Sequence, residues 1–190
     1  VGKPLGDTRR YVEEMRVASE GHPFPTLMLA ALRKRMTALS EEISEGVIWA
    51  NAAFSHMHKS LKEIEGRPQG FLVGNVTRTI VTNDVDAGRQ AFREAFLRYT
   101  SLPNYQNYYI EANYEEEIRK AKNALSNGDE VAAINAVSDR MVDDLSNIGT
   151  AAQVRAKVES WYDLGVTDLT LNPMSLSDPE QAHQEIMAAF

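Results

Sequence analysis

The two segments that decide the fold are Thr26-Leu27-Met28-Leu29-Ala30-Ala31 and Gly46-Val47-Ile48-Trp49-Ala50. Both are short apolar runs without alternation, which is typical of strands buried on both faces. Between them, Met36, Leu39 and Ile43 are spaced three and four residues apart, which predicts a helix over residues 36–44. A strand, a helix and a second strand in this order predict a parallel βαβ unit.

The rest of the chain continues the alternation of strands and helices. Residues 71–82 are rich in β-branched side chains and predict a long strand, and residues 166–171 predict a last strand. Helices are expected over residues 7–15, 55–64, 84–99, 114–126, 129–145 and 150–164 and after Asp178, with a break at 101–105. The pattern predicts an α/β fold around a parallel sheet, either open and doubly wound or closed into a barrel. No Gly-x-Gly-x-x-Gly motif follows any strand, so the dinucleotide fingerprint is missing.

The composition excludes several classes of function. The 190 residues include no cysteine, which excludes disulfides and thiolate chemistry, and the formal charge of −7 without a basic tract argues against nucleic-acid binding. No apolar run approaches the ~18 residues of a membrane span, so no membrane partner and a cytoplasmic location are expected. His56 and His58 lie two residues apart and cannot share a helix face, so no metal site is expected.

Three blocks, in this order and spacing, resemble the C-terminal half of the luciferase-like monooxygenase family. The blocks are Pro25–Leu32 with Arg35-Met36 and Glu45–Ile48, then Tyr99–Tyr105, then Thr150–Val154 running to Leu164–Pro173. The family includes bacterial luciferase and flavin- or deazaflavin-dependent oxidoreductases. The resemblance implies a (β/α)8 TIM barrel of the luciferase-like type, with FMN or a deazaflavin of the coenzyme F420 type at the C-terminal ends of the strands. It also implies a helical insertion before the last strand, at about residues 101–149.

The expected barrel is incomplete, because only four strands are predicted and a barrel of this kind usually takes ~250 residues. We therefore expect residues 1–190 to form a single partial barrel domain whose N-terminal half is missing from this sequence. Two unpaired strand edges would be left exposed. Closing the barrel needs either further residues or a partner, and a homodimer or a heterodimer with a homologue is expected.

One local departure concerns the first block. After Ala30-Ala31 the family usually has a glycine-containing turn, where the backbone passes close to the cofactor, whereas this chain has Leu32-Arg33-Lys34-Arg35. The basic side chains either contact a phosphate of the cofactor or substrate, or mark a solvated helix start where the cofactor site has decayed. Positive charge opposes the dipole at a helix N-terminus, so an anionic group is expected nearby.

The resemblance implies a cofactor at the C-terminal ends of the strands, and the candidate site residues are those expected there. The cofactor-binding candidates are Ala30, Ala31, Leu32, Arg33 and Asn51. The candidates for binding substrate or phosphate are Arg78, Asn172 and Ser175. Strand alternation places Arg78 with Gly74 on one face and Asn75 with Thr77 on the other. The structural alternatives are a turn role for Asn51, a surface position for Arg78, and turn and cap chemistry for Ser175.

Two functions remain open. The first is a luciferase-like oxidoreductase or monooxygenase that carries out redox chemistry on a small organic substrate, with the chemistry supplied by the cofactor. The second is a non-catalytic truncated or partner subunit of a luciferase-like complex. The missing half and the departure at Leu32–Arg35 favour the second function. No catalytic residue can be named, because the decisive side chains would lie in the absent half.

Overall fold

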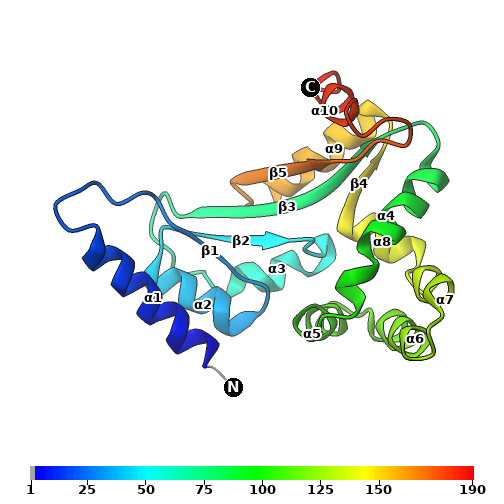
Figure 1. The fold of residues 1–190 in the computed structure, drawn as a ribbon. Coiled ribbons are helices and arrows are strands. Elements are labelled where there is room, and N and C mark those ends of the chain that lie inside the picture. The colour runs from blue at the N-terminus through cyan, green and yellow to red at the C-terminus, as the bar shows by residue number, and fades with distance from the viewer. Residues whose placement is uncertain (1–2) are drawn as a thin grey trace.

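A computed structural model describes residues 3–190 and shows a parallel sheet with helices around it (Figure 1). The strands are β1 (Met28–Ala30), β2 (Gly46–Ala50), β3 (Leu72–Val81), β4 (Ser146–Gly149) and β5 (Asp168–Pro173). The helices on either side of the first three strands are α1 (Pro4–Ala18), α2 (Lys34–Ile43), α3 (Phe54–Lys62) and α4 (Val85–Thr100). The later helices are α5 (Pro103–Glu111), α6 (Glu115–Ser126), α7 (Glu130–Asn135), α8 (Asp139–Leu145), α9 (Ala151–Asp163) and α10 (Ala182–Met187).

The long strand β3 organises the sheet. Its first half pairs with β2, which in turn pairs with β1, and its last residues, Arg78–Val81, pair with β4. Strand β5 pairs with residues 74–79 of β3. The Val76 carbonyl accepts a hydrogen bond from the backbone N–H of the residue that follows β2, and the Thr82 N–H donates to a backbone carbonyl of β4. The Val73 and Thr79 carbonyls accept hydrogen bonds from the backbone N–H groups of the residues on either side of β5. Since backbone groups alternate in direction along a strand, β2 and β4 lie along one edge of β3 and β5 lies along the other.

Strands β1, β2, β3 and β5 are thus four neighbouring parallel strands of the barrel wall. Among the described residues, β1 and β5 each pair along one edge only. One face of these four strands, the outer face, is covered, because Val47, Trp49 and Val73 pack with side chains of α3 and α9 in the main core. A second, smaller core joins Leu29 of β1 to α1 and α2.

The opposite face of the four strands, the inner face, is open to solvent. Met28, Ile48 and Val76 are half-buried, and Ala30 and Thr170 are exposed. In a closed barrel this face lines the packed interior. The prediction that the first strand is buried on both faces is therefore wrong, because nothing within residues 3–190 covers the inner side of Ala30.

Two glycines let Met28 lie flat across the inner face. A Cβ at Gly74 would come within 2.9 Å of Met28 Cε, and one at Gly46 would come within 2.8 Å of both the Cβ and the carbonyl oxygen of Leu72. Cβ atoms do not approach other atoms this closely without displacement. Glycine at these positions is therefore explained by the close approach of the three strands.

Helices α4 to α8 form a cap beside the C-terminal ends of the strands (Figure 1). Asp84, at the start of the helix predicted over residues 84–99, caps α4 and accepts a hydrogen bond of 3.0 Å from the Ala87 N–H. The segment predicted as one helix over residues 129–145 is two helices, because Ser138 caps α8 and ends the preceding turn. The break expected at residues 101–105 contains the start of α5, which begins at Pro103.

Other boundaries differ from prediction for local reasons. Helix α1 begins at Pro4, earlier than the predicted start at residue 7, and Asp7 therefore lies in its first turn. Helix α10 begins after Gln181 and not at Asp178. Strand β4 was not predicted, since its four residues carry no local strand pattern. The helix predicted over residues 150–164 is α9, whose N-cap residue Thr150 forms a reciprocal capping box with Gln153. No helix within the described part of the chain is long and apolar enough to cross a membrane.

Candidate active site

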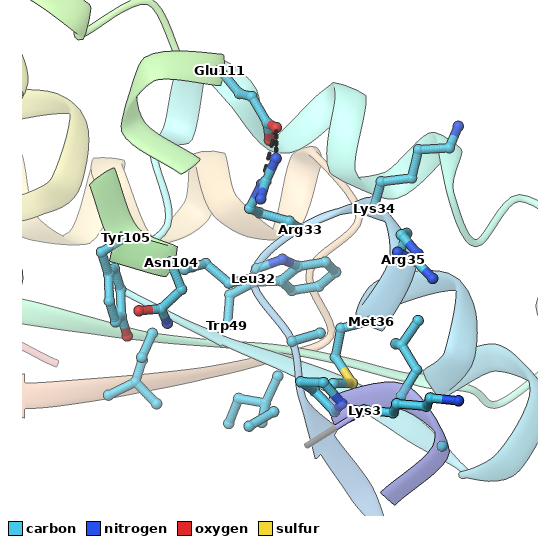
Figure 2. Close-up of a pocket in the computed structure, with 18 residues that line it drawn as sticks. Lys3, Leu32, Arg33, Lys34, Arg35, Met36, Trp49, Asn104, Tyr105 and Glu111 are labelled. Atoms are coloured by element: carbon cyan, nitrogen blue, oxygen red, sulfur yellow. Dashed lines mark hydrogen bonds and ion pairs between the residues drawn. The ribbon is translucent and has the colours of Figure 1, made fainter. Parts of the chain in front are cut away.

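A cavity of about 1170 Å³ lies where β1 and β2 end. Its floor is the inner face of the sheet, formed by Ala30, Ile48, Ala50 and Val76. Further wall residues come from the start of α1, the β1–α2 loop and α5. Figure 2 shows Tyr105 and Asn104 of α5 on one side of the cavity, Lys3 on the other, and the loop of Leu32 and Arg33 between them. The cavity thus opens at the C-terminal edge of a parallel sheet, where α/β folds bind their ligands.

Four of the five cofactor-binding candidates line this cavity. They are Ala30, Ala31, Leu32 and Arg33. The fifth, Asn51, is not among the lining residues. It is buried and has a positive φ of 54°, its N–H donates to the Val76 carbonyl, and its own carbonyl accepts from the Tyr109 hydroxyl. Asn51 therefore has the turn role that was the alternative for this residue.

The basic residues on the cavity rim are partly neutralised within the protein. Arg33 donates to Glu111 of α5 through Nε (3.0 Å) and Nη2 (2.5 Å), and these bonds raise the pKa of Arg33 (Figure 2). Lys34 forms an ion pair of 3.0 Å with Glu63. Arg33 is also the N-cap residue of α2, and its backbone is extended. The anionic group expected near this helix start is thus a carboxylate of the protein itself.

An aromatic cluster forms the wall behind Tyr105. The ring of Tyr105 packs edge-on against Tyr99 with 4.8 Å between centroids, and it lies 5.9 Å from the ring of Tyr109. Tyr108 and Tyr109 are fully buried, and burial raises the pKa of both hydroxyls. The Tyr108 hydroxyl accepts a 3.0 Å hydrogen bond from the Ala53 N–H. These contacts fix α5 against the ends of the strands.

The three candidates for an anionic group lie on and beyond β3 and β5. Arg78 and Asn172 are partners across the two strands, so their side chains share the inner face. Asn75 and Thr77 are fully buried on the opposite face, as alternation predicts. Ser175 follows β5, where its hydroxyl contacts Glu185 (3.0 Å) and Ser177 (3.2 Å). The structure brings Arg78 and Asn172 together, whereas Ser175 takes part in the turn before α10.

His56 lies at the start of α3, which follows β2 at the end of the sheet where the cavity opens. Its ring meets that of Tyr108 edge-on at 5.5 Å, and partial burial, with a smaller effect of Lys59, lowers its pKa. It does not line the cavity. No group of three or more metal-ligating side chains occurs between residues 3 and 190.

Sequence reasoning missed the contribution of α5 to the cavity. Asn104, Tyr105 and Glu111 line it, yet none of the three was among the predicted site residues. The pair Pro103-Asn104 carries a usable signal, because proline is favoured at the first position of a helix. Nothing local indicates that Glu111 meets Arg33.

Comparison with known proteins agrees with this geometry. The family model of luciferase-like monooxygenases matches residues 6–168. Among solved structures, a coenzyme F420-dependent tetrahydromethanopterin reductase from Methanopyrus kandleri superposes with a TM-score of 0.68 at 22% identity, covering 86% of this chain and 50% of that one. An F420-dependent secondary alcohol dehydrogenase, in complex with an F420-acetone adduct, gives a TM-score of 0.65 at 12% identity, covering 98% of this chain and 61% of that one. The apo structure of MsnO8 gives a TM-score of 0.56 at 13% identity, covering 97% of this chain and 60% of that one. No curated protein matches the sequence.

The fold and the family match define an incomplete luciferase-like TIM barrel. The chain belongs to the luciferase-like monooxygenase family. It spans about half to three-fifths of the chains to which it is structurally similar. The predicted family and the predicted incomplete barrel are both confirmed. Further strands of a barrel would pair with the free edges of β1 and β5 and so enclose the inner face.

Proposed function

We propose that this chain is the C-terminal half of a flavin- or deazaflavin-dependent oxidoreductase or monooxygenase that acts on a small organic substrate. The observation that carries the proposal is the cavity of about 1170 Å³ at the C-terminal ends of β1 and β2, lined by Ala30, Ala31, Leu32 and Arg33. Barrels of this class place their active sites at that end of the strands. The similar reductase and alcohol dehydrogenase are described as F420-dependent, and we extend this cofactor class, with FMN as the alternative, to this chain.

The residues present fit a flat polycyclic cofactor. Ala30 and Ala50 have minimal side chains and leave the floor of the cavity low, while Leu32, Ile48 and Val76 give it an apolar surface. Ligand sites of ~300–1,000 Å³ are typical for drug-sized molecules, and this cavity of about 1170 Å³ has room for such a molecule. No glycine follows Ala31, and the Arg33 side chain in the loop after it is held by Glu111 on the wall of the cavity.

Each element of the chain has a defined part in this proposal. The bound cofactor would supply the redox chemistry. Ala30 and Ala31 would support its ring system, and Tyr105 would close the site from the side of α5. The rim cations Lys3 and Arg35, which form no ion pair within residues 3–190, would attract the anionic part of the cofactor.

Cofactor binding tests the proposal directly. FMN and coenzyme F420 are each titrated with the purified protein, and cofactor fluorescence is followed. We expect one of them to bind with saturation. Ala30→Leu, which fills the floor of the cavity, should weaken that binding by about tenfold or more, the equivalent of ~1.4 kcal/mol. Ala132→Leu, at an exposed position of α7, is the matched control and should leave binding unchanged. Failure of both cofactors to bind would refute the proposal.

A second function is favoured by one specific observation, namely the open inner face and the single paired edges of β1 and β5. These features suit a non-catalytic partner subunit that completes a complex with itself or with a homologue. Sedimentation velocity distinguishes this function from the first. Association without cofactor binding supports the partner subunit, and a monodisperse monomer that binds a cofactor excludes it.

A further inference from the structure

The guanidinium of Arg78 is incompletely satisfied. Its Nε is buried and has no hydrogen-bond acceptor. Its Nη1 lies 3.7 Å from Met174 Sδ, a weak acceptor, and its Nη2 lies 3.4 Å from the Ala95 carbonyl oxygen. No carboxylate of residues 3–190 lies within ion-pair distance of it. A half-buried charge without an anionic partner costs free energy that a bound anion would recover.

Arg78 lies on the inner face of β3, the face that lines the inside of a barrel. Val76, two residues earlier on the same face of β3, lines the cavity. Arg78 Cζ lies 5.8 Å from the ring centroid of Tyr99, and Tyr99 packs on Tyr105, which also lines the cavity. Arg78 is therefore held next to the proposed cofactor site, on the side that faces β5.

Asn172 supplies a second donor beside Arg78. The two residues are partners in the parallel pairing of β3 with β5, so their side chains project from the same face of neighbouring strands. Asn172 is exposed. A side-chain amide next to a guanidinium offers N–H donors from two directions, an arrangement that suits the several oxygens of an oxyanion.

We propose that Arg78 and Asn172 form a binding site for an oxyanion group, a carboxylate or a phosphate, of the substrate. This inference rests on the proposed function, since it places the anion beside the cofactor cavity. The ion pairs of Arg33 with Glu111 and of Lys34 with Glu63 leave those rim residues already neutralised. Arg78 has no such internal partner, and this makes it the better anchor for a substrate anion.

The experiment uses inorganic phosphate as the probe, measured by calorimetric titration at fixed ionic strength with and without saturating cofactor. Phosphate should bind in both cases, because the site is separate from that of the cofactor. If cofactor binding displaces phosphate, the anion site belongs to a phosphate of the cofactor and the substrate assignment is wrong. If neither cofactor binds but Arg78-dependent phosphate binding persists, the proposed function fails while the anion site stands.

Three variants test which side chains bind the phosphate. Arg78→Met should weaken phosphate binding about tenfold or more, as expected for a charged hydrogen-bond donor. Arg98→Met is the matched control, because exposed Arg98 also stacks on Tyr99, at 5.9 Å, and it should keep the affinity within about twofold. Asn172→Asp places a carboxylate beside Arg78 at an exposed position and should abolish phosphate binding even if Arg78→Met fails to fold.

Two results would overturn the inference. One is an affinity for phosphate that is unchanged in both Arg78→Met and Asn172→Asp. The other is an equal loss in Arg78→Met and Arg98→Met, since that would show a general effect of surface charge. Thermal unfolding of each variant verifies that it is folded before titration.

Discussion

Arg33 in the β1–α2 loop and Glu111 at the end of α5 are 78 residues apart in sequence, yet both Nε and Nη2 of the arginine donate to one carboxylate oxygen. This pair joins the loop that lines the candidate cofactor cavity to the helical cap (Figure 2). The Glu111 carboxylate also offsets the unfavourable interaction between the positive charge of Arg33 and the dipole at the start of α2.

We expect this pair to position the loop and to add little stability. Both side chains are more than 40% exposed (46% and 41%), and exposed pairs contribute ~0.2–1 kcal/mol. A double-mutant cycle with Arg33→Ala and Glu111→Ala should give a coupling energy in that range, decreasing with added salt. Arg89 and Asp143 are the comparison, because Arg89 is only 23% exposed and makes two hydrogen bonds of 2.9 and 2.7 Å. A larger coupling for Arg33–Glu111 than for Arg89–Asp143 would contradict this view.

The glycines beneath Met28 lead to a prediction with an internal control. Gly46→Ala should lower the free energy of unfolding by about 1–3 kcal/mol through overpacking, because its Cβ would meet the Leu72 backbone at 2.8 Å. Gly74→Ala should cost less, since its nearest contact is the flexible end of Met28. Adding Met28→Ala should rescue Gly74→Ala but not Gly46→Ala, as measured by urea unfolding. Equal rescue of both variants would show that Leu72 is not the obstacle.

Asp144 of α8 connects α3 with Tyr114, the residue before α6. Its carboxylate accepts from the Ser55 N–H (2.8 Å), the Ser55 hydroxyl (2.7 Å) and the Tyr114 hydroxyl (2.7 Å). Asp144→Ala should destabilise the protein by about 1–3 kcal/mol, because a helix-start N–H and the hydroxyl of the buried Tyr114 lose their acceptor. Asp129→Ala removes an exposed cap of α7 and should cost less, near ~0.5–1 kcal/mol. Chemical denaturation compares the two, and an equal loss would refute the special role of Asp144.

The buried tyrosines predict a loss of stability at alkaline pH. Burial raises the pKa of Tyr108 and Tyr109 above the ordinary value of 10.0. The unfolded chain therefore releases these protons first, so their contribution to stability is complete below about pH 10 and declines as the pH rises toward the folded-state pKa. Unfolding free energies between pH 8 and 11 should show this decline, and Tyr109→Phe should reduce it. A decline that begins well below pH 9 would point to other groups.

Much of the fold could be predicted from the sequence because its signals are local. The apolar run at Gly46–Ala50 corresponds to β2 at both ends, and the Thr150–Gln153 capping box begins α9 one residue later. Gly165 has the positive φ of 103° expected after a helix. The order of such signals also identified the family, which the family model confirms.

The sequence alone predicted the parallel α/β class, since periodicity, caps and turn residues act within a few positions of each other. The resemblance of its three blocks to a known family added the family and the candidate site at Ala30–Arg33. Only the tertiary structure decided that Glu111 neutralises Arg33, that α5 supplies Tyr105 to the cavity, and that Arg78 lies beside Asn172. These relationships depend on how distant segments pack, and burial or charge pairing between residues tens of positions apart leaves no periodic trace in the chain. The open inner face was likewise visible only once the strands were placed side by side.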